Sequence, residues 1–151
     1  MTFIPALEPA VFVACLAPVV YVDLKQHRIP DLFLALAAAL LLALRAAQRS
    51  LRVEQLAGAA VGFTLFLGLW AASRGRLGFG DVKLSGLVGF LVGAQGWVVA
   101  VFLASLGGVL AILLRRLLLR VSLQERVAFA PFLIGGGVAS FFISGPLVSL
   151  L

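Results

Sequence analysis

The sequence predicts an all-α membrane protein, with six transmembrane helices forming a single domain over residues 1–151. Hydrophobic residues make up 63% of the chain and charged residues only 12%, whereas an average soluble domain has about 25% charged residues. A soluble fold of this length has too little interior for so many apolar side chains. The uncharged runs lack the strict alternation of barrel strands, and backbone groups in lipid must then be satisfied within helices.

Four of the six helices are expected directly from apolar runs, at residues 6–22, 31–47, 53–73 and 127–148. Each is close to the roughly 17–25 residues that cross a bilayer. Residues 1–10 contain no Lys or Arg, so we expect the first run to be a permanent helix and not a cleaved signal peptide. Cys15, the single cysteine, lies in this helix, where a packing role is expected.

The remaining two helices come from one uncharged run, residues 84–114. As a single helix this run would be about 46 Å long, well beyond the roughly 30 Å hydrocarbon core. The segment Gly93-Ala94-Gln95-Gly96 offers a turn in the middle. We therefore expect a short helix over residues 82–94 and a second over residues 97–119.

The basic residues support this split, because cytoplasmic loops of membrane proteins carry an excess of Lys and Arg. With six helices, nine of the 12 basic residues share one side of the membrane. These nine are Lys25, Arg28, Arg74, Arg76, Lys83, Arg115, Arg116, Arg120 and Arg126. The other side has three, Arg45, Arg49 and Arg52. Without the split the two sides would hold five and seven. The net charge of +6 is thereby explained by topology, with no need for a nucleic-acid partner.

Most of the six acidic residues have an ordinary structural interpretation. Glu8 and Glu54 are expected at helix N-termini, where the dipole favours a negative charge, and Glu125 in a loop. Asp31 follows Pro30 at the start of the second helix, a position that suits both residues, and is expected to cap that helix.

Asp23 and Asp81 are the acids that call for a further explanation. Asp23 ends the first helix, where the dipole disfavours an acid; either a basic neighbour in the next loop or a functional role accounts for it. Asp81 stands in Gly78-Phe79-Gly80-Asp81-Val82-Lys83, where glycines permit close backbone approach, and its alternative role is to cap the fourth helix. Lys83 either orients or charge-balances Asp81, or extends to the membrane interface. Both aspartates follow an odd number of crossings, so we expect them at the same, cytoplasmic face.

Two neighbouring carboxylates cannot both ionise cheaply, so one keeps a proton. The pair then offers a general base that activates water and a general acid that protonates a carbonyl oxygen or leaving amine. Other hydrolytic sets are missing from the sequence. The single histidine, His27, is too few for a usual zinc site, and no G-x-S-x-G motif occurs. We expect no metal and no cofactor.

These residues resemble the type IV prepilin peptidases, membrane aspartic endopeptidases with a GxGD motif. The resemblance rests on Asp23 followed by Arg28-Ile29-Pro30-Asp31, and on Gly78-Phe79-Gly80-Asp81-Val82-Lys83-Leu84. A partial third match is Arg126-Val-Ala-Phe-Ala-Pro131-Phe132-Leu133, where Ala128 and Ala130 replace the usual Pro and Gly of the family. The resemblance as a whole covers nearly all of the chain from Ala14 onward.

The resemblance implies that Asp23 and Asp81 are catalytic and that Gly78, Gly80 and Lys83, with Pro30 and Asp31, support them. It implies a multi-pass enzyme of the bacterial inner membrane that removes the basic leader of prepilins or pseudopilins at the cytoplasmic face. Its partners are then the substrate and the bilayer. Longer members carry an extra N-terminal cytoplasmic domain with paired Cys-x-x-Cys motifs and also methylate the new N-terminus. This chain is similar to short members that serve tight-adherence pili, and no methyltransferase activity is expected.

Two other classes of function stay open on the sequence. A small transporter could use the same acids to bind protons or cations, although transporter acids usually lie near the middle of the membrane between inverted repeats. A non-catalytic assembly factor of a pilus or secretion machine would tolerate the loss of both aspartates.

Overall fold

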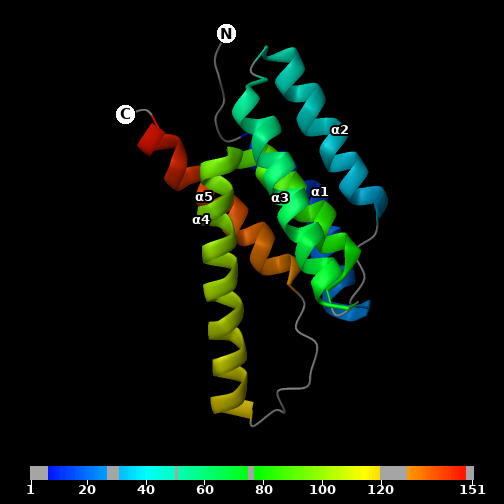
Figure 1. Ribbon diagram of the computed structural model, residues 1–151, viewed down its shortest axis with the longest axis vertical. Coiled ribbons are helices and arrows are strands. Elements are labelled where there is room, and N and C mark those ends of the chain that lie inside the picture. The colour runs from blue at the N-terminus through cyan, green and yellow to red at the C-terminus, as the bar shows by residue number, and fades with distance from the viewer. Residues whose placement is uncertain (1–6, 27–30, 50, 75–76, 120–128, 149–151) are drawn as a thin grey trace.

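The computed structural model describes residues 7–26, 31–49, 51–74, 77–119 and 129–148. Within these ranges the protein is all-helical, and no strand occurs. The helices are α1 (Leu7–Gln26), α2 (Asp31–Ala47), α3 (Val53–Ala72), α4 (Phe79–Leu119) and α5 (Ala130–Val148) (Figure 1). The all-α prediction is therefore confirmed. Two boundaries differ from those expected, since α1 extends past Asp23 and α4 begins before Asp81.

The long helix α4 is broken at Gly93, within the Gly93-Ala94-Gln95-Gly96 segment where a turn was predicted. Gly93 has φ 75° and ψ 176°, a backbone conformation that is essentially restricted to glycine. The chain turns at this residue, and the second half of α4 runs back in the direction from which the first half came (Figure 1). The break lets one uncharged run of sequence form two helical segments.

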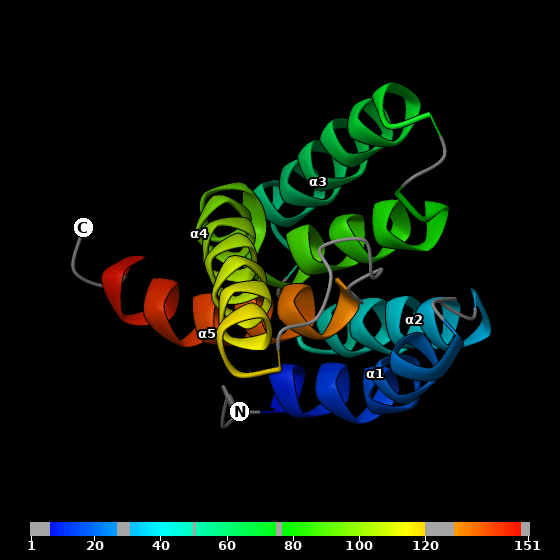
Figure 2. The ribbon, with the colours of Figure 1, turned by 90° about the horizontal axis from the view of Figure 1, so that it is seen from below.

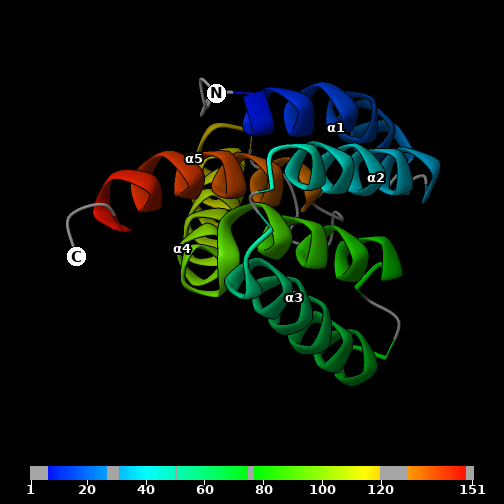
Figure 3. The same ribbon diagram turned by 90° about the horizontal axis from the view of Figure 1, so that it is seen from above.

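The first half of α4 is the centre of the fold. Figures 2 and 3 show it running between α2 on one side and α3 on the other. Helices α3 and α5 pack against α4, and α1 pairs with α2 as a hairpin that also contacts α5. One core cluster of buried residues includes Leu84 and Leu91 from α4, with Leu16, Leu41 and Leu133 from α1, α2 and α5.

Helix α3 crosses the first half of α4 at a separation that only small residues allow. A Cβ atom on Gly89 would lie 2.0 Å from the carbonyl oxygen of Gly58, and one on Gly62 would lie 2.5 Å from that of Ser85. Small residues four positions apart on each helix therefore face each other, the arrangement that brings helix backbones together in membranes. The Trp97 indole donates to the Ser85 hydroxyl at 2.9 Å, which donates to the Gly62 carbonyl at 3.1 Å.

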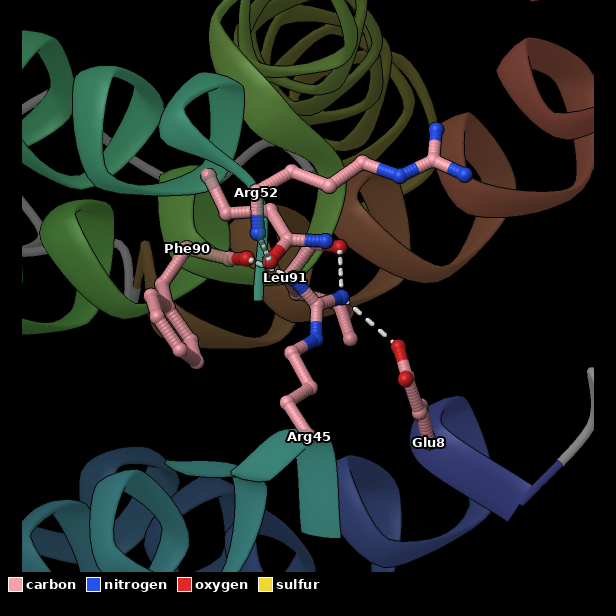
Figure 4. Close-up of polar contacts among 6 residues, drawn as sticks. Glu8, Arg45, Arg52, Phe90 and Leu91 are labelled. Carbon is pink, nitrogen blue, oxygen red and sulfur yellow. Dashed lines mark hydrogen bonds and ion pairs between the residues drawn. The ribbon is translucent and has the colours of Figure 1, made fainter. Parts of the chain in front are cut away.

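Arg45 is buried beside the break in α4 (Figure 4). Its guanidinium donates to the carbonyl oxygens of Phe90 at 2.8 Å and Leu91 at 2.7 Å, and forms a 2.6 Å ion pair with Glu8 from α1. Carbonyls before a helix end lack intrahelical partners, and a cation is favourable there. Glu8 lies in the first turn of α1, as expected, but the sequence did not predict that it is buried or that it pairs with Arg45. Each is buried because the other neutralises it.

Among the described residues, two helices are long and apolar enough to cross a membrane, judged by length and composition. They are Val53–Ala72 and Phe79–Leu118. The second contains the break at Gly93. Large apolar side chains are exposed on several helices, among them Leu69, Val98, Phe102 and Leu118. Six transmembrane crossings stay a prediction. Cys15 is half-buried against the core, in line with a packing role.

Candidate functional site

Four helix ends gather at one end of the bundle, opposite the Arg45 ion pair. They are the C-terminal ends of α1 and α3 and the N-terminal ends of α2 and α4 (Figure 1). This arrangement follows from the alternating directions of consecutive helices. It brings the segment that carries Asp81 to the end where Asp23 and Asp31 lie, although Asp81 is 50 positions or more from both in the sequence.

Asp23 and Asp81 lie within electrostatic reach of one another. Asp23 is in the last turns of α1 and is buried, with 6% of its surface exposed. Asp81 is in the first turn of α4 and is half-buried. The two carboxyl groups are close enough for a charge on Asp23 to disfavour ionisation of Asp81. The two acids that the sequence singled out thus share one partly enclosed place, although 58 positions separate them in the chain.

Gly78 holds the Asp81 side chain through backbone contacts. The Asp81 backbone N–H donates to the Gly78 carbonyl at 3.1 Å, and the Gly78 backbone hydrogen-bonds the Asp81 carboxylate. A Cβ on residue 78 would lie 3.3 Å from Asp81 Oδ2, closer than most side-chain contacts. A larger residue at position 78 would therefore crowd the Asp81 carboxylate, which explains the glycine. Gly80, which lies between Gly78 and Asp81 in the sequence, is half-buried.

Lys83 has a different partner from the one considered in the sequence. Its ammonium group lies 2.7 Å from Asp31 Oδ2 and 5.3 Å from the centre of the Phe79 ring. Asp31 is the first residue of α2, as expected, but its carboxylate connects α2 to α4 through this ion pair. Lys25, one basic neighbour considered for Asp23, hydrogen-bonds the Tyr21 hydroxyl.

Some predicted site residues lie outside the described part of the chain. They include His27, Pro30 and the Arg28-Ile29 segment, together with Arg126 and Ala128. Of the third motif, Pro131, Phe132 and Leu133 are described in the first turn of α5, where Leu133 is fully buried in the core. Among the described residues, no cluster of three or more His, Cys, Asp or Glu side chains could hold a metal ion.

Sequence reasoning missed the buried ion pair of Arg45 with Glu8. A signal was present, since Arg45 follows thirteen uncharged residues of α2, and a charge embedded in an apolar helix usually has a buried partner. The partner could not be identified without the fold. This pair and the pair of aspartates lie at opposite ends of α1, so the two polar centres of the bundle are separate.

Residues 10–113 match the family model described as the type IV leader peptidase family. The chain belongs to the type IV leader peptidase family. The match includes Asp23, Asp31 and the whole Gly78–Leu84 motif, the segments that the fold brings together at the candidate site.

Two relatives of this family are both named prepilin leader peptidase/N-methyltransferase. The relative from Bacillus subtilis (strain 168) is 30% identical over 94 residues, which cover 62% of this chain and 38% of the relative. The relative from Dickeya chrysanthemi is 34% identical over 96 residues, covering 60% of this chain and 34% of the relative. The matched region thus spans little more than a third of either relative. No solved structure matches the chain.

Proposed function

We propose that this protein is a membrane aspartic endopeptidase that removes the leader peptide from type IV prepilins or related pseudopilins. Membership of the leader peptidase family supports the reaction class, and the names of the two relatives support the substrate. The observation that carries the proposal is that Asp23 and Asp81 lie at one end of the bundle, close enough for their charges to interact. Two acids in one site can hydrolyse a peptide bond without a covalent intermediate, one as general base and the other as general acid.

In the proposed reaction, one aspartate is ionised and the other protonated, because two adjacent carboxylates are costly to ionise together. The ionised carboxylate takes a proton from water, and the water oxygen bonds to the carbonyl carbon of the scissile peptide. The protonated partner donates to the carbonyl oxygen. When the C–N bond breaks, the aspartate that took the proton from water gives it to the leaving amine, and its partner takes a proton back from a hydroxyl of the tetrahedral intermediate. The products are a carboxylic acid and a free amine, and the pair of aspartates regains its starting protonation. The burial of Asp23 favours this chemistry, since electrostatic effects are stronger where water is scarce.

The proposal places the site at the cytoplasmic face of the bacterial inner membrane, in a bundle that crosses six times. Two features of the fold support this orientation. The break at Gly93 returns the second half of α4 toward the end where the aspartates lie. Arg45 is buried, so it does not count among the exposed charges of the opposite end. Exposed Arg49 and Arg52 are then the remaining basic residues there, and the positive-inside bias is stronger than the sequence alone indicated.

The test is leader removal from a prepilin that is co-expressed with this protein in a bacterial membrane. We expect Asp23→Asn and Asp81→Asn each to abolish cleavage while both variants accumulate in the membrane, because either change removes one half of the acid–base pair. Glu54→Gln is the matched control, since Glu54 is an exposed acid at the other end of α3 and should leave cleavage unchanged. Metal chelators should have no effect.

Normal processing by either aspartate variant would refute the mechanism and would favour an assembly role. Loss of activity in chelator, restored by added metal, would point to a metallopeptidase. If the wild-type protein leaves the prepilin uncut while the aspartate variants alter ion flux across proteoliposomes, the transporter alternative would be the better account of these acids.

A further inference from the structure

An apolar groove runs along the bundle between α2 and α3, with the first half of α4 as its floor. Figures 2 and 3 show these three elements side by side, with α4 in the middle. The groove has a volume of about 690 Å³, within the range of clefts that bind ligands. All of its lining residues are apolar except Asp31 and Lys83.

The walls of the groove follow the helical period. On α2 the lining residues step from Asp31 through Leu34 and Ala38 to Leu42, a rise of about 16 Å at 1.5 Å per residue. On α3 the wall is Leu56, Ala59 and Phe63, and on α4 the floor is Gly86, Leu87 and Phe90. The groove is therefore an elongated channel parallel to the helices, about half as long as the hydrocarbon core is thick.

Small side chains line the middle of this groove on all three helices. They are Ala35 and Ala38 on α2, Ala59 on α3 and Gly86 on α4. Small residues at such positions let another helix backbone approach closely, and the larger side chains on either side then pack around it. The shape thus suits one face of an apolar helix, inserted through residues spaced three and four apart.

The charged end of the groove lies at the same end of the bundle as the candidate site. Lys83 and Asp31 form its end, and Asp81 lies two residues before Lys83 on the same turn of α4. The Asp31 side chain is still 68% exposed despite its ion pair, and Asp23 and Asp81 lie at the same end of the bundle. A helix in the groove would meet carboxylates where it leaves the apolar walls. The exposed carboxylate of Asp31 therefore suits an occupant with a basic residue next to one end of its apolar helix.

We propose that this groove binds the apolar helix of the prepilin substrate, with the basic flank of that helix at Asp31 and the scissile bond beside Asp23 and Asp81. The inference rests on the proposed peptidase function, and it assigns the surface that holds the substrate. The groove fixes the helix along the bundle, so the residues just beyond its charged end lie at the pair of aspartates. Binding through remote apolar contacts positions the peptide bond for attack.

Filling the groove tests this assignment in proteoliposomes that contain the full chain and a prepilin. Ala38→Phe and Ala59→Phe place a ring in the groove from opposite walls. Ala39→Phe and Ala60→Phe are matched controls, because these alanines are exposed neighbours on the same helices but do not line the groove. At limiting substrate we expect the first two variants to cleave about tenfold more slowly or worse, the effect of losing one well-packed anchor. The controls should cleave at the wild-type rate.

Photocrosslinking measures binding separately from cleavage. A photoreactive residue replaces Leu42, which lines the groove, or Leu36, which lies on another face of α2, in an Asp81→Asn background. The two side chains are matched in exposure, at 49% and 47%. We expect the prepilin helix to be captured from position 42 and not from position 36.

The outcomes separate this inference from the proposed function. If the wild-type protein cleaves and the Ala38→Phe and Ala59→Phe variants cleave like their controls, the groove assignment is wrong and the peptidase proposal stands. If position 42 captures the prepilin but the wild-type protein never cleaves it, the groove assignment stands and the peptidase proposal fails. Capture of lipid alone, or of a second copy of this chain, at position 42 would overturn the groove assignment.

Discussion

Replacement of Arg45 by glutamine should be among the most destabilising single changes in this protein. The Arg45 side chain is 2% exposed, and its guanidinium neutralises Glu8, whose side chain is 6% exposed. It also satisfies the carbonyl oxygens of Phe90 and Leu91 before the break in α4. Arg45→Gln leaves a buried carboxylate without its cation. Breaking a buried ion pair in this way costs about 3–5 kcal/mol of unfolding free energy.

Glu8→Gln should cost less, about 1–3 kcal/mol, because the amide oxygen still accepts a hydrogen bond from Arg45 and the two carbonyls keep their donor. The double variant should cost less than the sum of the single variants, since the second change removes a charge that the first left unpaired. The coupling between the two residues is thus a direct measure of the ion pair.

The assay is unfolding of the purified protein in mixed detergent micelles with increasing sodium dodecyl sulfate, followed by circular dichroism. Arg49→Gln is the control, because Arg49 is an exposed arginine just beyond the same helix, and a surface change of this kind shifts stability by less than about 0.5 kcal/mol. A cost for Arg45→Gln no larger than that of Arg49→Gln, or strictly additive single and double variants, would refute the reasoning.

Three further predictions concern the same unfolding measurement. Gly93→Ala should lower the free energy of unfolding by about 1–3 kcal/mol, because alanine is strained at φ 75° and ψ 176°. An unchanged stability would mean that the break does not depend on glycine at this position. Gly89→Ala should cost about 1–3 kcal/mol or more, since the new Cβ would meet the Gly58 carbonyl at 2.0 Å. Gly68→Ala should instead be neutral or stabilising by up to about 1 kcal/mol, because nothing lies within 4 Å of its added Cβ; equal effects at Gly89 and Gly68 would contradict the close crossing. Lys83→Gln should lower the free energy of unfolding by at most about 1 kcal/mol, because the ion pair with Asp31 is largely exposed. Its effect should become smaller at high salt. A larger, salt-independent loss of stability would indicate a buried role for Lys83.

The helices and the two acids of interest could be predicted from the sequence. Uncharged runs of this length have one solution in lipid, which is the α-helix, and a run too long for one crossing must break where glycine permits. The break at Gly93 followed from this argument. The convergence of Asp23 and Asp81 at one end followed from counting helix directions, which requires no knowledge of how the helices pack.

Contacts between helix faces could not be predicted in the same way. The Asp31–Lys83 ion pair, the contact of Gly58 with Gly89 and the burial of Arg45 all depend on which side of each helix faces its neighbour. A soluble helix shows its buried side as an apolar stripe, but these helices are apolar all round, so the stripe is missing.

The sequence by itself therefore determined that the chain is helical, that the long uncharged run breaks near Gly93, and that the two aspartates lie at the same end of the bundle. Only the tertiary structure decided the rotation of each helix about its axis. That rotation buries Arg45 against the break in α4 and opens the groove between α2 and α3. The physical reason is that close packing of small residues and rare buried charges sets helix rotation in an apolar bundle, and both depend on partners remote in the chain.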